Sequence, residues 1–291
     1  MARDVTPGYR LMGALLTGIA MLAFAANSLL ARMALADGGI GAVAFTMLRL
    51  ASGAAMLAAL MQLSRSRSAK GRGNLVSACC LLAYALGFSL AYLRLGAALG
   101  ALLLFASVQA SMLGLAIAAG HRPNTLEITG LAVAFIAFVW LMLPGLHAPD
   151  PLGAAAMIIA GIAWGVYSLR GRGSASPMAD TAGNFVGAAL LCVPVAMAAA
   201  WIGPSQPMHP GNVALAITSG TLTSGLGYVI WYRALPHLRP LQAASVQLTV
   251  PVIAALGAVA VLGENLSLRL VLAGTAILGG VATTILGRTT A

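Results

Sequence analysis

The chain has 291 residues, of which 60% are hydrophobic and 8% are charged, and its mean hydropathy is +0.95. This balance excludes a water-soluble domain and is typical of a polytopic membrane protein. The formal charge of +10 would suggest a nucleic-acid partner in a soluble protein. In a membrane chain the distribution of the basic residues matters more than their sum, so we expect no nucleic-acid partner.

Apolar runs of about 20 residues recur along the chain, and each is long enough to cross a hydrocarbon layer of roughly 30 Å as a helix. The loops between them are short, and most prolines lie in these loops or at the ends of the runs. The predicted fold is therefore all-α. In chain order, we predict ten transmembrane helices over residues 13–33, 41–62, 75–93, 97–119, 125–144, 152–169, 181–201, 211–231, 241–261 and 268–287.

Basic residues are distributed unevenly over the predicted loops. With the N-terminus inside the cell, twelve of the sixteen basic residues lie on the cytoplasmic side and only Arg94 and Arg269 lie outside. Because cytoplasmic loops carry an excess of Lys and Arg, we predict a multi-pass protein of the bacterial cytoplasmic (inner) membrane with both termini in the cytoplasm. The expected partners are the lipid bilayer and a small-molecule substrate, and the oligomeric state is not predicted.

The chain contains a duplication. The tetrapeptide Ala-Ser-Val-Gln occurs at 106–109 and again at 244–247, 138 residues later, each time inside a long apolar run. The tripeptide Tyr-Leu-Arg at 92–94 precedes the first copy much as Trp-Tyr-Arg at 231–233 precedes the second. The repeated unit is therefore a set of membrane helices.

We predict two five-helix repeats, residues 1–146 and residues 147–291. Because five is an odd number, the second repeat enters the membrane from the opposite side and the two are inverted. Inverted repeats recur in secondary transporters, whose substrate sites lie near the middle of the membrane between the halves. The alternative is a duplicated scaffold without a pathway.

Three stretches carry a resemblance to a known family. Residues 161–168 read Gly-Ile-Ala-Trp-Gly-Val-Tyr-Ser, residues 45–49 follow a Phe-x-x-x-Arg pattern, and Leu-Gly-Glu at 262–264 precedes the last span. With two sets of five spans, the chain resembles the EamA family of the drug/metabolite transporter superfamily over essentially its whole length. Within that family it most resembles the YddG-type exporters of aromatic and other neutral amino acids. One departure is His121, which occupies the first-half position that corresponds to Glu264.

Polar residues inside the predicted spans are candidates for a substrate pathway, because a polar group that faces lipid is costly. Gln109 and Gln247 are repeat-related amides that both donate and accept hydrogen bonds, which suits the ammonium and carboxylate of a zwitterion. They could equally serve only to hydrogen-bond neighbouring helices. Asn27 in the first span and Trp164 with Tyr167 in the sixth occupy matching places in the two halves.

Aromatic residues add surface that would accommodate an apolar or aromatic side chain. Tyr92, Trp231 and Tyr232 could instead belong to an interfacial belt, because they lie near the ends of predicted spans. The predicted substrate-binding residues are Asn27, Tyr84, Gln109, Trp164, Tyr167, Tyr228 and Gln247.

Arg49 and Pro251 are predicted to have gating or structural roles. An Arg inside a membrane span is a functional candidate. Arg49 could attract a substrate carboxylate, but it could also snorkel to the outer surface or pair with Asp37, and the structural role is favoured. Pro251 lacks an N–H group inside the ninth span and could act as a gating hinge.

All six acidic residues fall in or near predicted loops, so we expect no buried carboxylate. Transport down a gradient is therefore favoured over proton coupling. The sequence contains no P-loop, no metal-ligand cluster and no set of Ser, His and acid that fits one site. We expect no enzymatic activity, no catalytic residue, no bound metal and no cofactor.

The sequence as a whole predicts a secondary transporter that exports neutral or aromatic amino acids across the cytoplasmic membrane by alternating access through a central cavity. The alternative is a transporter of another small metabolite, a drug, a nucleotide sugar or a lipid. A nucleotide sugar would require several basic residues around the cavity to hold its phosphates, and only Arg49 is predicted there. A non-transporting assembly or sensor subunit is the third possibility.

Overall fold

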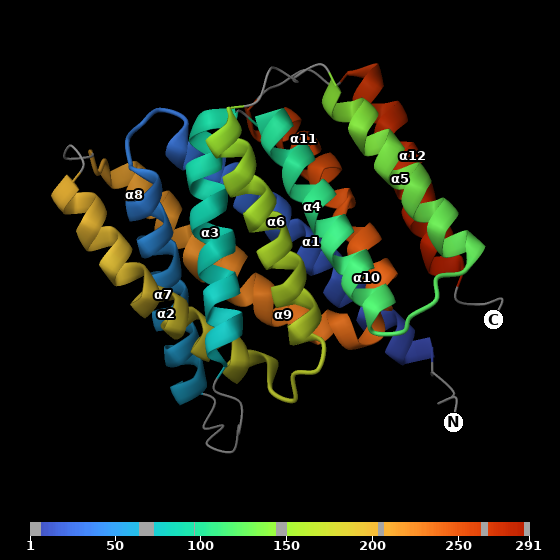
Figure 1. Ribbon diagram of the computed structural model, residues 1–291, viewed down its shortest axis with the longest axis horizontal. Coiled ribbons are helices and arrows are strands. Elements are labelled where there is room, and N and C mark those ends of the chain that lie inside the picture. The colour runs from blue at the N-terminus through green and yellow to red at the C-terminus, as the bar shows by residue number, and fades with distance from the viewer. Residues whose placement is uncertain are drawn as a thin grey trace.

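The computed structural model describes residues 7–63, 73–95, 97–143, 150–202, 207–262 and 267–287. Within these ranges the chain forms ten helical spans that are long and apolar enough to cross a membrane, packed side by side (Figure 1). The prediction of an all-α polytopic membrane protein is confirmed. The first seven spans are α1 (Pro7–Leu35), α2 (Ala42–Leu63), α3 (Leu75–Leu95), α4 (Ala97–Ala118), α5 (Thr125–Met142), α6 (Pro151–Gly171) and α7 (Pro177–Ile202).

The last three spans include two interruptions of the α-helical pattern. The eighth span comprises α8 (Pro210–Thr218), the π-helix η2 (Ser219–Leu226), α9 (Gly227–Ala234) and the 3-10 helix η3 (Leu235–His237). The ninth comprises α10 (Pro240–Gln247) and α11 (Thr249–Leu262), and the tenth is α12 (Leu268–Leu286). The observed spans differ from the predicted ones mainly at their ends, where polar residues continue a helix beyond its apolar part.

Side-chain caps determine where several helices begin. The side chain of Asp150 accepts a hydrogen bond from the N–H of Gly153 at 2.7 Å at the start of α6. Ser267 accepts one from the N–H of Leu270 at 3.1 Å at the start of α12. These caps satisfy backbone N–H groups that have no partner within the helix.

The break in the ninth span has a local cause. Pro251 has no N–H group to donate to the carbonyl of Gln247, four residues earlier. The N–H of Leu248 donates instead to the carbonyl of Ser245 at 3.0 Å, so the last turn of α10 tightens before α11 begins. Pro251 therefore loosens its helix as expected, whereas its predicted role as a gating hinge stays a prediction.

The main packing contacts join the first five spans to the last five. α5 lies along α12, α2 lies along α7, α6 packs against α3 and α4, and α1 packs against the eighth and ninth spans (Figure 1). These pairs have a symmetry. If spans one to five exchange places with spans six to ten, in order, the same set of neighbouring pairs results. Two related repeats would give such a pattern, and the division into repeats stays a prediction. The predicted boundary between residues 146 and 147 lies outside the described residues.

The start of α1 and the end of α12 lie at the same end of the bundle (Figure 1). We call this end the terminal face and the other end the distal face. α1, α3, α5, α7 and α10 begin at the terminal face, whereas α2, α4, α6, α8 and α12 begin at the distal face.

Gly130 of α5 and Gly280 of α12 let the two helices touch backbone to backbone. A Cβ atom placed on Gly280 would lie 2.6 Å from the carbonyl oxygen of Gly130 and 2.6 Å from the nitrogen of Ala134. A side chain there would separate two stretches of backbone. Close approach of this kind is typical of membrane helices that pack through small residues.

Replacing Gly280 by alanine is expected to lower the free energy of unfolding by about 1–3 kcal/mol, because the added methyl group forces the helices apart. Gly279 provides a matched control on the same helix, since a Cβ placed there would meet nothing within 4 Å. Gly279→Ala should be neutral or stabilising by up to about 1 kcal/mol. Denaturant or thermal unfolding of the purified protein in detergent measures both, and equal losses would contradict the close contact.

Candidate functional site

Aromatic rings from four helices meet inside the bundle. The ring centroid of Trp164 in α6 lies 4.8 Å from that of Tyr84 in α3 and 4.8 Å from that of Tyr228 in α9. Phe24 of α1 contacts the same indole at 5.2 Å, and Tyr167 stacks on it at 5.7 Å. All five side chains are buried. We call them the aromatic centre, and it contains four of the predicted substrate-binding residues.

The two repeat-related glutamines lie where α10 approaches this centre. The indole N–H of Trp164 donates to Gln247 Oε1 at 2.6 Å, and Gln247 Nε2 donates to the carbonyl of Ala243 at 2.9 Å. Gln109 Nε2 donates from α4 to the carbonyl of Ala244 at 2.8 Å. Both amides thus donate hydrogen bonds to backbone carbonyls of α10, close to the point where the ninth span is interrupted. Gln109 Oε1 is buried and accepts no hydrogen bond from the described residues, so one acceptor stays open.

Asn27 belongs to a polar network between α1 and the eighth span. Its Oδ1 atom accepts hydrogen bonds from the hydroxyls of Ser219 at 2.7 Å, Thr223 at 3.2 Å and Ser224 at 3.3 Å. All three hydroxyls lie on the π-helix η2. Asn27 therefore holds α1 against η2, a packing contact that its polar character alone did not predict.

Arg49 is 1% exposed and connects α2 to the eighth span. Its Nε atom donates to Ser224 Oγ at 2.7 Å, and its Nη2 atom donates to the hydroxyl of Tyr228 at 2.5 Å. The guanidinium carbon lies 5.4 Å from the ring centroid of Tyr84. Two of the expected alternatives, snorkelling and a pair with Asp37, are therefore wrong. Arg49 points inward to the aromatic centre.

Asp37 has other partners in the loop between α1 and α2. Its Oδ1 atom accepts hydrogen bonds from the N–H of Gly39 at 2.9 Å and from Asn212 Nδ2 at 2.7 Å. These two donors hold the pKa of the Asp37 carboxyl below its usual value. The carboxylate therefore joins this loop to the start of α8.

Trp231 and Tyr232 are buried, so the expectation that they could form an interfacial belt is wrong for both. The indole N–H of Trp231 donates to Ser168 Oγ at 3.1 Å, and the hydroxyl of Tyr232 donates to the carbonyl of Tyr167 at 3.3 Å. Both contacts tie the eighth span to α6 in the terminal half of the bundle.

A cavity of about 230 Å³ lies in the distal half and reaches the distal ends of α3, α4 and α5. None of the seven predicted substrate-binding residues is in its described lining. Phe88 in the wall packs on Tyr84 of the aromatic centre, with ring centroids 6.0 Å apart. The cavity and the aromatic centre are therefore adjacent. The wall is mostly apolar and includes Ser28, Arg32, Phe88, Tyr92, Phe105 and Pro251.

Sequence reasoning missed Phe88 and Phe105 because an apolar residue in an apolar span carries no sign of whether it faces lipid, a neighbouring helix or a cavity. Tyr84, Phe88 and Tyr92 recur at intervals of four residues, which places them on one face of a helix. Their rings are in contact in sequence order, at 6.0 Å and 5.5 Å. This spacing was the signal that could have found the wall of the cavity.

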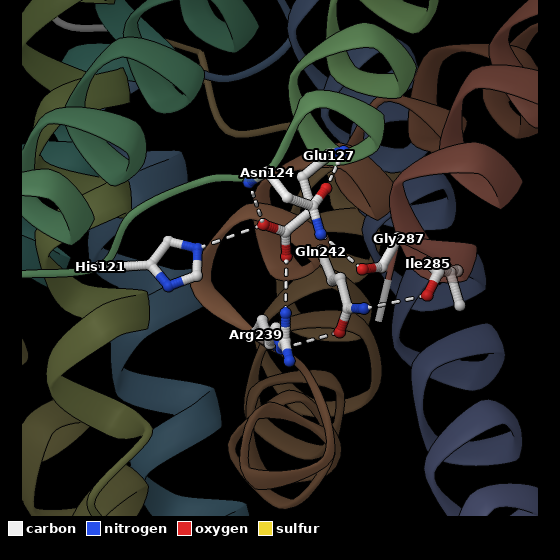
Figure 2. A network of polar contacts seen from close by, with 7 residues as sticks. All are labelled: His121, Asn124, Glu127, Arg239, Gln242, Ile285 and Gly287. Atoms are coloured by element: carbon white, nitrogen blue, oxygen red, sulfur yellow. Dashed lines mark hydrogen bonds and ion pairs between the residues drawn. The ribbon is translucent and has the colours of Figure 1, made fainter. Parts of the chain in front are cut away.

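A second polar cluster joins three helix ends at the terminal face (Figure 2). Glu127, in the first turn of α5, contacts Arg239 Nη1 at 3.3 Å and His121 Nε2 at 3.5 Å. Asn124 caps α5 and donates from its side chain to the carbonyl of Gly287 at 2.5 Å. The cluster fastens the start of α5 to the start of α10 and the end of α12.

The expectation that no carboxylate is buried is wrong, because Glu127 has no exposed surface. Asn124 and Glu127 form a capping box, in which the N–H of Asn124 donates to Glu127 Oε2 at 3.1 Å and the N–H of Glu127 donates to Asn124 Oδ1 at 2.8 Å. The spacing of Asn and Glu predicts this local pair. The partner Arg239 is 112 residues away, which no local pattern predicts.

Ten apolar helices around a buried polar and aromatic interior define a multi-pass membrane protein. Residues 151–286 match the family described as EamA-like transporter family. An uncharacterized protein of Pseudomonas aeruginosa is 47% identical over 268 residues, which cover 92% of each chain. A crystal structure of a protein that is 18% identical shares the fold, with a TM-score of 0.80 over 95% of this chain and 98% of the other. The chain belongs to the EamA-like transporter family.

Proposed function

We propose that the protein is a secondary transporter that exports neutral or aromatic amino acids across the bacterial cytoplasmic membrane by alternating access. Both termini then lie in the cytoplasm, the terminal face is cytoplasmic and the distal face is outside. The observation that carries the proposal is a difference between the two faces. A cavity lies in the distal half, whereas the repeat-related region of the terminal half is closed by hydrogen bonds.

The first closing contact involves two positions whose counterparts line the cavity. Ser28 and Tyr92 lie in the cavity wall. Their counterparts are Ser168 and Trp231 when runs 24–29 and 92–94 are aligned with runs 164–169 and 231–233, which share, respectively, an aromatic first residue with a final Ser-Leu and an aromatic residue two positions before Arg. In the second repeat the side chains of these two residues are hydrogen-bonded to each other at 3.1 Å. The positions that line a cavity in one repeat are thus in contact in the other.

The second closing contact also joins two residues whose counterparts in the other repeat line the cavity. Leu104 and Met142 line the cavity. Leu104 corresponds to Gln242, by the spacing of the two Ala-Ser-Val-Gln copies, and Met142 corresponds to Ile285, by the distance from the helix cap. Gln242 Nε2 donates to the carbonyl of Ile285 at 3.3 Å, beside the ion pair of Glu127 (Figure 2). Alternating access requires that such contacts separate while the distal cavity closes.

The chemistry of the interior supports an amino-acid substrate. The aromatic centre suits an apolar or aromatic side chain, and the open acceptor Gln109 Oε1 suits an ammonium group. In the described wall of the cavity Arg32 is the one basic residue. The phosphates of a nucleotide sugar require more cationic partners than that. Neutral amino acids are therefore favoured over a nucleotide sugar.

The test is efflux from proteoliposomes loaded with a mixture of labelled amino acids, compared with protein-free liposomes. We expect one or a few neutral or aromatic amino acids to leave at a rate well above the leak. Parallel vesicles loaded with a drug, a nucleotide sugar or a labelled lipid test the other substrates. Efflux of one of these, with no amino acid above the leak, would replace the amino-acid assignment.

A further inference from the structure

We propose that Arg49 anchors a carboxylate group of the transported molecule, so that the substrates are small carboxylates with an apolar or aromatic body. The proposal rests on the protein being a transporter, but it does not require that the substrate be an amino acid. It assigns to Arg49 a ligand that the fold alone does not identify.

Arg49 is a buried cation whose partners among the described residues are all neutral. Ser224 and Tyr228 contribute hydroxyls and Tyr84 contributes the face of a ring. The Nη1 atom of Arg49 is buried and makes no hydrogen bond with the described residues. A buried charge without a counter-ion is costly, and the cost falls when an anion pairs with it. An incoming carboxylate supplies that anion.

Two aromatic rings, Phe88 and Tyr84, link the cavity to Arg49. Tyr84, which faces the guanidinium, packs on Phe88 in the cavity wall. On a second route, Ser224 donates to Asn27, and the next residue, Ser28, lies in the wall. Movement of the Phe88 and Tyr84 rings would therefore bring a molecule in the cavity toward the guanidinium.

The surroundings of Arg49 are suited to exchange its partners. Ser224 lies on the π-helix η2 and Tyr228 lies just after it, and π-helical turns occur frequently at functional sites. A carboxylate can accept two parallel hydrogen bonds from the fork of an arginine. The Tyr228 hydroxyl, which accepts from Arg49, can donate its own hydrogen to the same carboxylate. Trp164 and the other rings of the aromatic centre then surround the apolar part of the ligand.

The experiment compares binding of matched pairs of acids and their amides to the purified protein by calorimetry. The pairs are phenylalanine, leucine, 3-phenylpropionate and benzoate, each with the amide of its carboxyl group. We expect the acid of at least one pair to bind about tenfold or more tightly than its amide. If no pair shows this preference, including the case in which nothing binds, the proposal is overturned.

Arg49→Lys and Arg49→Gln then show whether the preference depends on this residue. Lys keeps the charge but loses the fork, so the acid should bind roughly tenfold more weakly while the amide is unchanged. Arg49→Gln should remove the preference altogether. Equal losses for acid and amide, with a lowered melting temperature, would mean a structural role and would overturn the proposal. If these variants do not fold, Tyr228→Phe replaces them. This change should weaken binding of the acid and leave binding of the amide unchanged.

Arg32→Gln is the matched control, because Arg32 contributes a basic side chain to the cavity wall itself. We expect the acid preference to survive this change. Its loss in Arg32→Gln but not in Arg49→Gln would move the carboxylate site to Arg32 and overturn the proposal. If 3-phenylpropionate binds through Arg49 but no amino acid binds, the carboxylate anchor stands and the amino-acid assignment fails.

Discussion

Replacing Gln247 by alanine is expected to destabilise the protein more than the same change at the repeat-related Gln109. Gln247→Ala leaves the buried indole N–H of Trp164 without its acceptor and removes the bond to the carbonyl of Ala243. Gln109→Ala removes one bond, to the carbonyl of Ala244. Each orphaned buried group costs about 1–3 kcal/mol, so the difference between the two variants should be of that size. Thermal unfolding in detergent measures it.

The same substitution should also reduce substrate efflux about tenfold or more, because the orientation of the Trp164 ring in the aromatic centre depends on Gln247. A double-mutant cycle identifies the cause. In a Gln247→Leu background, Trp164→Phe removes the orphaned donor and should restore part of the lost stability. Equal melting temperatures for the Gln247 and Gln109 variants would show that the indole hydrogen bond contributes nothing.

Replacing Arg239 by glutamine is expected to open the terminal face. The change leaves the carboxylate of Glu127 buried without its cation, which is costly in a closed state and relieved by hydration in an open one. The side chain of Arg239 is 36% exposed, so solvent screening reduces the effect to about 1–2 kcal/mol. That energy shifts the ratio of open to closed molecules roughly tenfold.

Two cysteine probes report the opening, in a protein whose native cysteines Cys79, Cys80 and Cys192 are replaced by alanine. Ala254 lines the distal cavity, and Ala116 is its buried counterpart in the terminal half. We expect Arg239→Gln to increase labelling of Ala116→Cys by a water-soluble maleimide and to decrease labelling of Ala254→Cys.

A neighbouring arginine supplies the control for this opening. Arg233 lies at the same face and is exposed, so Arg233→Gln should leave labelling unchanged. Adding Glu127→Gln to Arg239→Gln removes the uncompensated charge and should close the face again in part. Labelling that rises equally in Arg233→Gln and Arg239→Gln would mean that the ion pair does not hold the face closed.

The number and order of the spans could be predicted from the sequence because each depends on its own apolar length. The interruption of the ninth span at Leu248 could also be predicted, because Pro251 acts only on residues close to it in the chain. The π-helix η2 was not predicted, because its Ser, Thr and Gly residues are compatible with an ordinary helix. The hydroxyls of Ser224 and Ser219 in this helix are hydrogen-bonded to Arg49 and Asn27, which lie far away in sequence.

The aromatic centre was predicted in part because tyrosines and tryptophans are conspicuous within apolar spans. The hydrogen-bond partners of the polar residues could not be predicted in the same way. Arg49 bonds residues 175 and 179 positions away, and Glu127 bonds a residue 112 positions away. Choosing such partners requires the packing of whole helices. This is why the role of Arg49 stayed open among several alternatives and why the burial of Glu127 was not predicted.

The packing of each half mainly against the other has a consequence for how the chain is made. Ribosomes synthesise proteins from the N-terminus, so α1–α5 enter the membrane before their principal neighbours exist. α1 waits longest, because its main neighbours lie in the eighth and ninth spans. α5 pairs with α12, which is the last of the described helices to be synthesised. Glu127, Arg49 and Gly130 therefore spend part of biosynthesis facing lipid or another protein.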